Sequence, residues 1–210
     1  MKRLVLIGDI VSSKKIASRK ELQKKLQSLF KSFNKSSKTI ISPFTITLGD
    51  EFQAVFSKAD NVFKYLWEIL HAIYPVKVRF SFGIGEITTS INTVQAIGMD
   101  GPAFYNAREG LIELKQGSFL FNIIHDDKEK VQMIKQILFL LSHLSSGWKD
   151  KRYKILSLLY DDLSAYQIAE KLKMSDKAVY KNIDAGALLN VISITKLISN
   201  EINILLKGRD

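Results

Sequence analysis

Hydrophobic and polar residues follow two kinds of pattern along the chain, and the change between them falls near residue 126. Before this point, short runs typical of strands are interleaved with amphipathic helical spacing, whereas every later pattern is helical. The uninterrupted apolar run at 4–7 predicts a strand that is buried on both faces. Strict alternation over 76–84 predicts a strand with one buried face.

Two short strand-like runs, 44–48 and 52–56, meet at Gly49 and Asp50, a turn pair that predicts a β-hairpin. The other patterns before residue 126 predict helices at 19–34, 62–73 and 102–114 and a last strand at 118–124. This order of elements predicts an α+β sandwich of the ferredoxin-like or palm type. We place it at residues 1–126, followed by a linker helix at 127–149 and an all-α helix-turn-helix domain at 150–210.

The all-α part contains a helix-turn-helix pattern at 164–183, in which Ser175 is placed to cap the second helix. Lys177, Tyr180 and Lys181 occupy outward positions of that helix, and we expect them to contact DNA in the major groove. A helical bundle that only packs or dimerises is the alternative interpretation. The segment resembles the four-helix LuxR-type and sigma region 4 type modules, which implies DNA as a partner.

The final helical stretch, 188–206, is apolar over more than one stripe. Such a helix needs a partner surface, and a second copy of the chain supplies one, so we predict a homodimer. No uninterrupted apolar run reaches the 18 residues of a membrane span, and the N-terminal apolar run is too short for a signal peptide. We therefore expect a cytoplasmic protein without a membrane partner.

The composition narrows the chemistry that the protein performs. With 46% hydrophobic and 25% charged residues among 210, the chain has the profile of a folded globular protein rather than a disordered one. It contains no cysteine, which excludes disulfides, thiolate zinc sites and cysteine nucleophiles, and its three scattered histidines argue against a His-rich metal site. We expect no haem, flavin or zinc, and we expect carboxylates to hold any metal ion.

The net charge of +10 is unevenly distributed along the chain. Residues 1–40 contain eleven Lys and Arg against two Asp and Glu, a net of +9, whereas 151–210 contain ten against seven, a net of +3. The prediction of DNA binding for the C-terminal part therefore rests on its helical pattern and not on its charge.

Asp9 ends the predicted central strand, and Asp50 lies at the tip of the predicted hairpin beside it. Two carboxylates together with substrate phosphates are a common way to hold Mg²⁺ in nucleotide chemistry. Taken alone, the two residues also suit a loop cap and an ordinary turn. Their surroundings decide between these interpretations.

Four segments of the N-terminal part resemble the palm-type nucleotide cyclases, both the class III adenylate and guanylate cyclases and the GGDEF diguanylate cyclases. They are GDIVSS at 8–13, LGDEF at 48–52, RFSFGIGE at 79–86 and GPAFYNAR at 101–108. The resemblance implies that Asp9 and Asp50 bind Mg²⁺ or Mn²⁺ and that Arg108 stabilises a transferred phosphoryl group. It further implies that a nucleoside triphosphate or cyclic nucleotide contacts Ile10, Val11, Ser12, Ser13, Lys14, Gly49 and Glu51.

The chain departs from the class III pattern at positions that read the base and assist catalysis. Ile46 stands where the base-reading lysine is placed, Gly98 where its companion aspartate is placed, and Phe104 where the catalytic asparagine is placed. Asn106 is out of register with that asparagine. The residues expected to bind metal and phosphate are thus retained more fully than those expected to select and cyclise a substrate.

The succession of GDIVSS, TLGDEFQAVF, GPAFYNAREGL and a helix-turn-helix resembles the SatD family of bacterial proteins over nearly the whole chain. Our leading hypothesis is a regulator in which a nucleotide- and Mg²⁺-binding cyclase-like domain alters DNA binding by the C-terminal module. One alternative is an active nucleotidyl cyclase or related phosphoryl-transfer enzyme. A second alternative is a degenerate protein-interaction scaffold.

Overall fold

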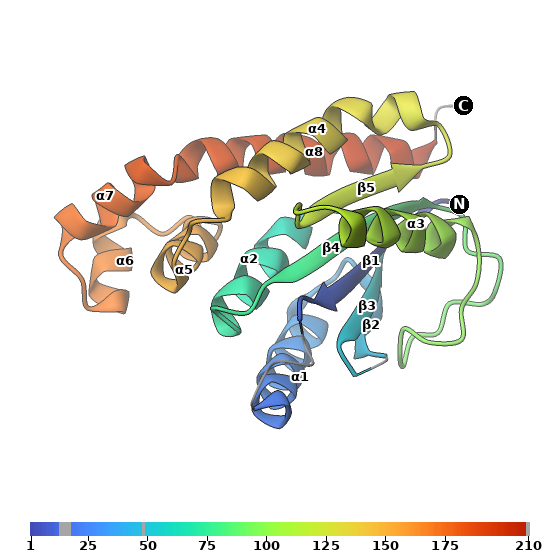
Figure 1. Cartoon of the computed structure of the whole chain (residues 1–210), viewed down its shortest axis with the longest axis horizontal. Helices are drawn as coiled ribbons and strands as arrows, with labels where there is room; N and C mark the ends of the chain where they lie inside the picture. Colours follow the sequence, from blue (N-terminus) through green and yellow to red (C-terminus); the bar gives the residue numbers. More distant parts are fainter. Residues whose placement is uncertain (13–17, 48, 209–210) are drawn as a thin grey trace.

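The computed structural model describes residues 1–12, 18–47 and 49–208, and the elements in these ranges form a mixed sheet flanked by helices (Figure 1). The strands are β1 (Arg3–Ile10), β2 (Ile40–Ile46), β3 (Glu51–Phe56), β4 (Val78–Gly85) and β5 (Phe121–His125). They are arranged in the order β2-β3-β1-β4-β5. The central strand β1 pairs antiparallel with both β3 and β4, β2 and β3 form the predicted hairpin, and β5 pairs parallel with β4. The predicted α+β class is confirmed.

Helices cover both faces of this sheet. The amphipathic helices α1 (Arg19–Ser36) and α2 (Val62–Ala72) pack on one face, where a cluster of aromatic rings includes Phe30, Phe44 and Phe52. Helix α3 (Pro102–Gln116) packs on the other face against a smaller apolar cluster that includes Val5 and Ile7 of β1. Because side chains alternate along a strand, odd-numbered residues of β1 point toward α3 and even-numbered residues toward α1 and α2.

The burial of β4 differs from the sequence-based prediction. Its alternating pattern predicted one buried face, yet every residue from Phe80 to Gly85 is buried. Helix α3 covers the second face, which carries Ser81, Gly83 and Gly85 in place of apolar side chains. Small residues let the helix approach closely. Because Ser and Gly do not count as hydrophobic positions, the sequence pattern did not predict this contact.

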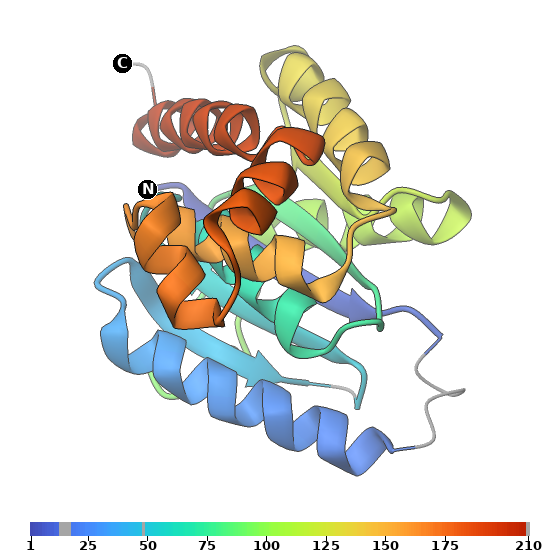
Figure 2. The ribbon, with the colours of Figure 1, turned by 90° about the vertical axis from the view of Figure 1, so that its left-hand side faces the viewer.

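After β5 the described chain is helical, as the sequence predicts. The helices are α4 (Lys128–Ser145), α5 (Asp150–Leu159), α6 (Ala165–Leu172), α7 (Asp176–Ala185) and α8 (Leu188–Lys207). Helices α4 and α8 lie along the same side of the molecule (Figures 1 and 2). Figure 1 shows α7 at the end of the molecule away from the chain termini, and this end faces the viewer in Figure 2.

The helical part shares one hydrophobic core with the sheet. Trp67 of α2 contacts Trp148 and Tyr153, with ring centroids 6.0 and 6.3 Å away. Asn203 of α8 accepts a hydrogen bond from the Ala59 amide at 2.7 Å, which ties the last helix to the segment before α2. These buried contacts cross the predicted domain limits at 126 and 149, and the limits stay predictions.

By length and composition alone, helix α8 is long and apolar enough to cross a membrane. An 18-residue stretch of it has a mean hydropathy of 1.2, and 33% of that stretch is buried in the protein. Uninterrupted apolar runs, the criterion of the sequence analysis, miss it because residues such as Asn190, Lys196 and Glu201 divide the run. Its inner face, which includes Leu188, Ile198 and Ile202, is buried in the same core as α2 and α5. Such a core helix gives the same compositional signal as a membrane span.

Candidate functional site

A row of three charged residues crosses the sheet where β1 ends. Asp9 of β1 is directly opposite Glu51 on β3 and directly opposite Arg79 on β4. Two carboxylates directly opposite each other repel, so this pair requires neighbouring cations. Arg79 supplies one of them, because its Nη1 donates to Asp9 Oδ2 at 3.1 Å.

Helix α3 supplies two further cations to the same place. Arg108 Nη1 donates to Glu51 Oε2 at 2.7 Å. Lys115 Nζ lies 3.2 Å from Asp9 Oδ1 and 3.2 Å from Glu51 Oε1, so its ammonium group bridges the two carboxylates. Arg108 and Lys115 are seven residues apart, which places both on one side of the helix. We call Asp9, Glu51, Arg79, Arg108 and Lys115 the charge cluster.

The charge cluster has a buried acidic floor and a more exposed cationic rim. The side chains of Asp9 and Glu51 are 8% and 10% exposed, whereas those of Arg108 and Lys115 are 45% and 44% exposed. Buried carboxylates must be paired to be tolerated, and here each is paired twice. The rim cations remain accessible to an anion that arrives from solvent.

The bridging position of Lys115 alters its protonation equilibrium. Burial by itself lowers the pKa of the ammonium group, but hydrogen bonds with Asp9 and Glu51 and the charges of both carboxylates outweigh burial, so the pKa is raised. Lys115 is therefore charged at neutral pH. The end of a helix also favours a cation, and Lys115 lies in the last turn of α3.

Close packing of α3 on β4 brings the rim cations down to the sheet. A Cβ atom added at Gly83 would lie 2.1 Å from the Ala103 carbonyl oxygen and 2.3 Å from the Ala107 nitrogen. A Cβ atom at Gly110 would lie 2.4 Å from Ser81 Oγ. These contacts leave no room for a side chain at either glycine, so the glycines set the distance between helix and sheet and with it the reach of the cations.

The predicted site residues divide into two groups in the structure. Asp9, Glu51 and Arg108 come together in the charge cluster. Asp50 is half-buried at the turn before β3, where its carbonyl oxygen accepts the Ile10 amide at 3.0 Å. Glu51, and not Asp50, is thus the carboxylate that faces Asp9 across the strands.

The other predicted contacts of the nucleotide lie around the end of β1. Ile10 is buried in the core, and the amide of Val11 donates to the Lys77 carbonyl at 2.9 Å. Both backbone donors are used within the protein, so phosphate contacts of this loop would have to begin at Ser12, which is exposed with a φ of 56°. The predicted residues Ser13 and Lys14 lie outside the described residues.

Gly49 lies at the turn with a φ of +63°, and its carbonyl oxygen accepts from Gln23 Nε2 at 2.9 Å. A Cβ atom there would lie 2.6 Å from Arg19 Nη2, so a guanidinium group from the start of α1 lies against this turn. Asn106, by contrast, is buried away from the cluster and donates to the Ile84 carbonyl and to Asp126. Asn106 therefore stabilises the contact of α3 with β4 and β5.

Sequence reasoning missed Arg79 and Lys115. Arg79 occupies a polar position of an alternating strand, a pattern that predicts exposure to solvent, whereas the register of β4 with β1 places it beside Asp9. Lys115 follows Arg108 by two helical turns, and this spacing was the available signal that both side chains converge.

The charge cluster, in the arrangement described, does not fit the predicted divalent cation. Carboxylate oxygens are suitable donors for Mg²⁺ or Mn²⁺. However, all four oxygens of Asp9 and Glu51 contact a cationic side chain, and Lys115 lies between the two carboxylates. Among the described residues, no group of three or more His, Cys, Asp or Glu side chains is arranged to hold a metal ion.

The helix-turn-helix segment forms its two helices with the expected caps. Ser164 and Gln167 form a capping box at the start of α6, and Ser175 Oγ accepts the Ala178 amide at the start of α7. Val179 and Ile183 of α7 are buried. The residues predicted to contact DNA, Lys177, Tyr180 and Lys181, are exposed on the outer face of α7.

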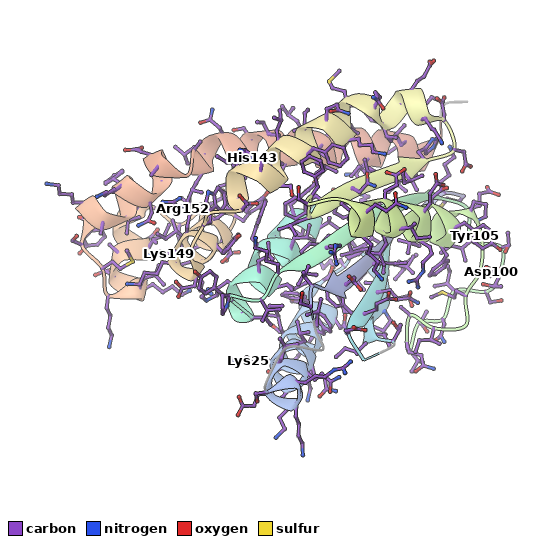
Figure 3. All side chains as sticks on the ribbon, in the orientation of Figure 1. Lys25, Asp100, Tyr105, His143, Lys149 and Arg152 are labelled. Carbon is purple, nitrogen blue, oxygen red and sulfur yellow. The ribbon has the colours of Figure 1, made fainter. Side chains whose placement is uncertain are left out.

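Basic side chains at the start of α5 lie near this segment. Figure 3 shows Lys149 and Arg152 close to the end of the molecule formed by α6 and α7. The Arg152 guanidinium lies 5.9 Å from the Trp148 ring centroid, and Arg152 Cδ lies against Gly186 at the end of α7. Arg152 thus joins α5 to α7.

Comparisons with known proteins identify the family of the chain. A search of curated proteins finds no match. Among solved structures, the chain is similar to a bacterial light-regulated adenylyl cyclase, with 14% identity and a TM-score of 0.37, over 59% of this chain and 43% of that one. The chain thus covers less than half of that protein, and a similarity of this size carries no argument about fold or activity. The SatD family matches residues 3–202, so the chain belongs to the SatD family.

Proposed function

We propose that the protein is a regulator that binds the phosphates of a nucleotide at the charge cluster and binds DNA through α7. The observation that carries the nucleotide half is the pair of accessible cations, Arg108 and Lys115, held over two buried carboxylates. A phosphate that approaches the rim meets both cations.

The chemistry of the rim suits phosphate. A guanidinium group has five N–H donors in a planar fork that matches two phosphate oxygens, and Arg108 contacts Glu51 through Nη1. An ammonium group adds three donors without a fixed plane. The ligand class is a nucleoside triphosphate or a cyclic nucleotide, as expected from the resemblance to palm-type cyclases. The strand order β2-β3-β1-β4, with α1 and α2 on one face, is compatible with that fold.

The predicted Mg²⁺ or Mn²⁺ enters this proposal as an ion that accompanies the phosphates. Asp9 and Glu51 would supply hard oxygen donors for it if Lys115 turned toward the phosphates. Asp50, half-buried at the neighbouring turn, stays a predicted ligand of that ion.

The DNA half rests on α6 and α7. A capped second helix with buried Val179 and Ile183 presents two lysines and a tyrosine outward, which suits phosphate contacts and base contacts in a major groove. The proposed homodimer would place two such helices on two half-sites. Exposed apolar residues on α4 and α8, Met133, Leu140 and Leu197, give that dimer an apolar surface.

A melting experiment tests the nucleotide half. The melting temperature of wild type and of Arg108→Met is measured with ATP, GTP, cyclic mononucleotides and cyclic dinucleotides, each with and without Mg²⁺. A ligand at 100 times its Kd adds about 2.7 kcal/mol to the stability of the folded state, which is a shift of several degrees. The proposal predicts a rise in wild type that is lost in Arg108→Met. No rise with any of these ligands contradicts it.

A gel-retardation experiment tests the DNA half with duplex DNA from the protein's own operon at low salt. The Lys177→Ala and Lys181→Ala double variant loses phosphate contacts and is expected to bind more weakly and with a shallower salt dependence than wild type. Lys196→Ala on α8 is the matched control, because Lys196 is exposed on a different helix. Equal binding by all three proteins, or binding by none, contradicts the DNA half.

A further inference from the structure

The four carboxylate oxygens of the charge cluster are divided between outer and inner partners. Arg79 contacts Asp9 Oδ2 and Arg108 contacts Glu51 Oε2, each from its own side. Lys115 alone contacts one oxygen of each carboxylate, Asp9 Oδ1 and Glu51 Oε1, at 3.2 Å in both cases. Its ammonium group therefore occupies the place where a single cation screens both buried charges from each other.

We propose that Lys115 is a built-in counter-ion that holds the place of a divalent cation between Asp9 and Glu51. While the ammonium group is there, the cluster excludes Mg²⁺ and Mn²⁺, and when the ammonium group leaves, Asp9 and Glu51 accept the metal ion. Lys115 is thus the residue that determines whether this site is a metal site.

The Lys115 ammonium group and a divalent cation exclude each other because of distance and charge. A divalent cation needs these oxygens at about 2.1 Å, and it would then lie within a few ångströms of an ammonium group held by the same two oxygens. Two positive charges at such separation repel strongly in a partly buried site. Arg79 and Arg108 do not prevent metal binding in the same way, because they contact the outer oxygens.

The ammonium group is able to leave. Lys115 lies in the last turn of α3, one residue before the helix ends at Gln116, and its side chain is 44% exposed on a flexible stem. The carboxylates, in contrast, are fixed on paired strands and stay buried. An anion at the rim therefore draws the lysine outward without moving the oxygens that would hold the metal ion.

In the regulator proposed above, the phosphates of the nucleotide are that anion, so the metal ion binds only together with the nucleotide. This coupling rests on the proposed function. The exclusion of metal by Lys115 does not, because it depends only on contacts within the chain.

The test is a Mn²⁺ titration of the full chain without nucleotide. Binding is measured as the decrease of the free Mn²⁺ signal in electron paramagnetic resonance. Lys115→Met is expected to bind one Mn²⁺ at least about tenfold more tightly than wild type, since it removes the competing cation and keeps both carboxylates. Lys115→Arg keeps the charge and is expected to behave as wild type. Lys128→Met removes an exposed lysine of α4 and controls for net charge.

Two results overturn the proposal. The first is equal Mn²⁺ binding by wild type and Lys115→Met. The second is a gain that persists when Asp9→Asn is added to Lys115→Met. If Lys115→Met is too unstable for titration, its melting temperature with and without Mn²⁺ gives the same answer, because a metal ion that binds the folded state raises it more than in wild type. Failure of this test leaves the nucleotide melting experiment intact, since that experiment measures ligand binding and not metal exclusion.

Discussion

At the scale of single residues, the charge cluster depends on pairing rather than on the number of charges. Asp9 and Glu51 are buried, lie opposite each other and would repel without their cationic partners. Arg79 differs from the rim cations, because its side chain is only 20% exposed and its partner Asp9 only 8%. We therefore expect Arg79 to stabilise the fold, and Arg108 and Lys115 to serve the site.

Arg79→Met is expected to lower the free energy of unfolding by about 3 kcal/mol, because it leaves a buried carboxylate with one partner fewer. Urea denaturation of both proteins measures the change. Lys128→Met, which removes a long contact between exposed side chains, is the control and is expected to change stability by less than about 0.5 kcal/mol. A loss as small as in the control would contradict the structural role of Arg79.

The lowered pKa of His125 predicts how the stability of the fold depends on pH. Burial and the neighbouring Lys2 lower the pKa of this imidazole below its usual 6.5, with Lys130 acting in the same direction and Asp126 and Asp127 opposing them. Because the folded state resists protonation, the stability that His125 provides is complete above about pH 6.5 and is lost as the pH falls below that value.

Urea denaturation at pH 7.5 and at pH 5.5 checks this direction. Wild type is expected to be less stable at the lower pH, and His125→Gln is expected to show a smaller difference between the two. His71, whose pKa is also lowered by burial, keeps part of the pH dependence in the variant. An equal pH dependence in both proteins would show that His125 titrates as it does in the unfolded chain.

At the scale of elements, the contact of α3 with β4 positions the site. Gly83→Ala places a Cβ atom 2.1 Å from the Ala103 carbonyl oxygen, so the helix must shift away from the sheet. We expect a loss of about 2–3 kcal/mol in the free energy of unfolding and weaker nucleotide binding. Gly117→Ala just after the helix meets no atom within 4 Å and is expected to be nearly neutral. Similar stability of both variants would contradict the close approach of α3.

The elements were largely predictable from the sequence, whereas the contacts between them were only partly so. The apolar run at 4–7 and the helical spacing of α1 and α2 gave elements whose positions the structure confirms. Gly83 and Gly110 are invisible to a hydrophobic pattern, although they determine how closely α3 packs. Asp9, Glu51 and Arg108 were found through resemblance, but Arg79 and Lys115 required the strand register and the helix position.

At the scale of the whole molecule, the sheet and the C-terminal helices share one core. Trp67 stacks against Tyr153 and makes a tilted ring contact with Trp148, and α8 is hydrogen-bonded to the segment before α2. The DNA-binding candidate at α7 and the charge cluster therefore belong to one packed body. Buried side chains of α2, β4, α5 and α7 belong to the same hydrophobic core.

A shared core predicts a single cooperative unfolding transition. Urea unfolding followed by tryptophan fluorescence and by far-ultraviolet circular dichroism is expected to give coincident curves. Trp148→Ala is expected to shift both curves together by about 3–4 kcal/mol, since it removes a large buried ring that contacts α2. Two separate transitions would indicate that the parts on either side of residue 149 fold independently.

Calorimetric titration tests whether the charge cluster binds the phosphates of a nucleotide. The nucleotide that raises the melting temperature most is titrated into wild type and into Arg108→Met in the presence of Mg²⁺. Because the variant loses charge-assisted hydrogen bonds, we expect its Kd to be about tenfold to a hundredfold higher. The same Kd in both proteins would contradict phosphate binding at the charge cluster.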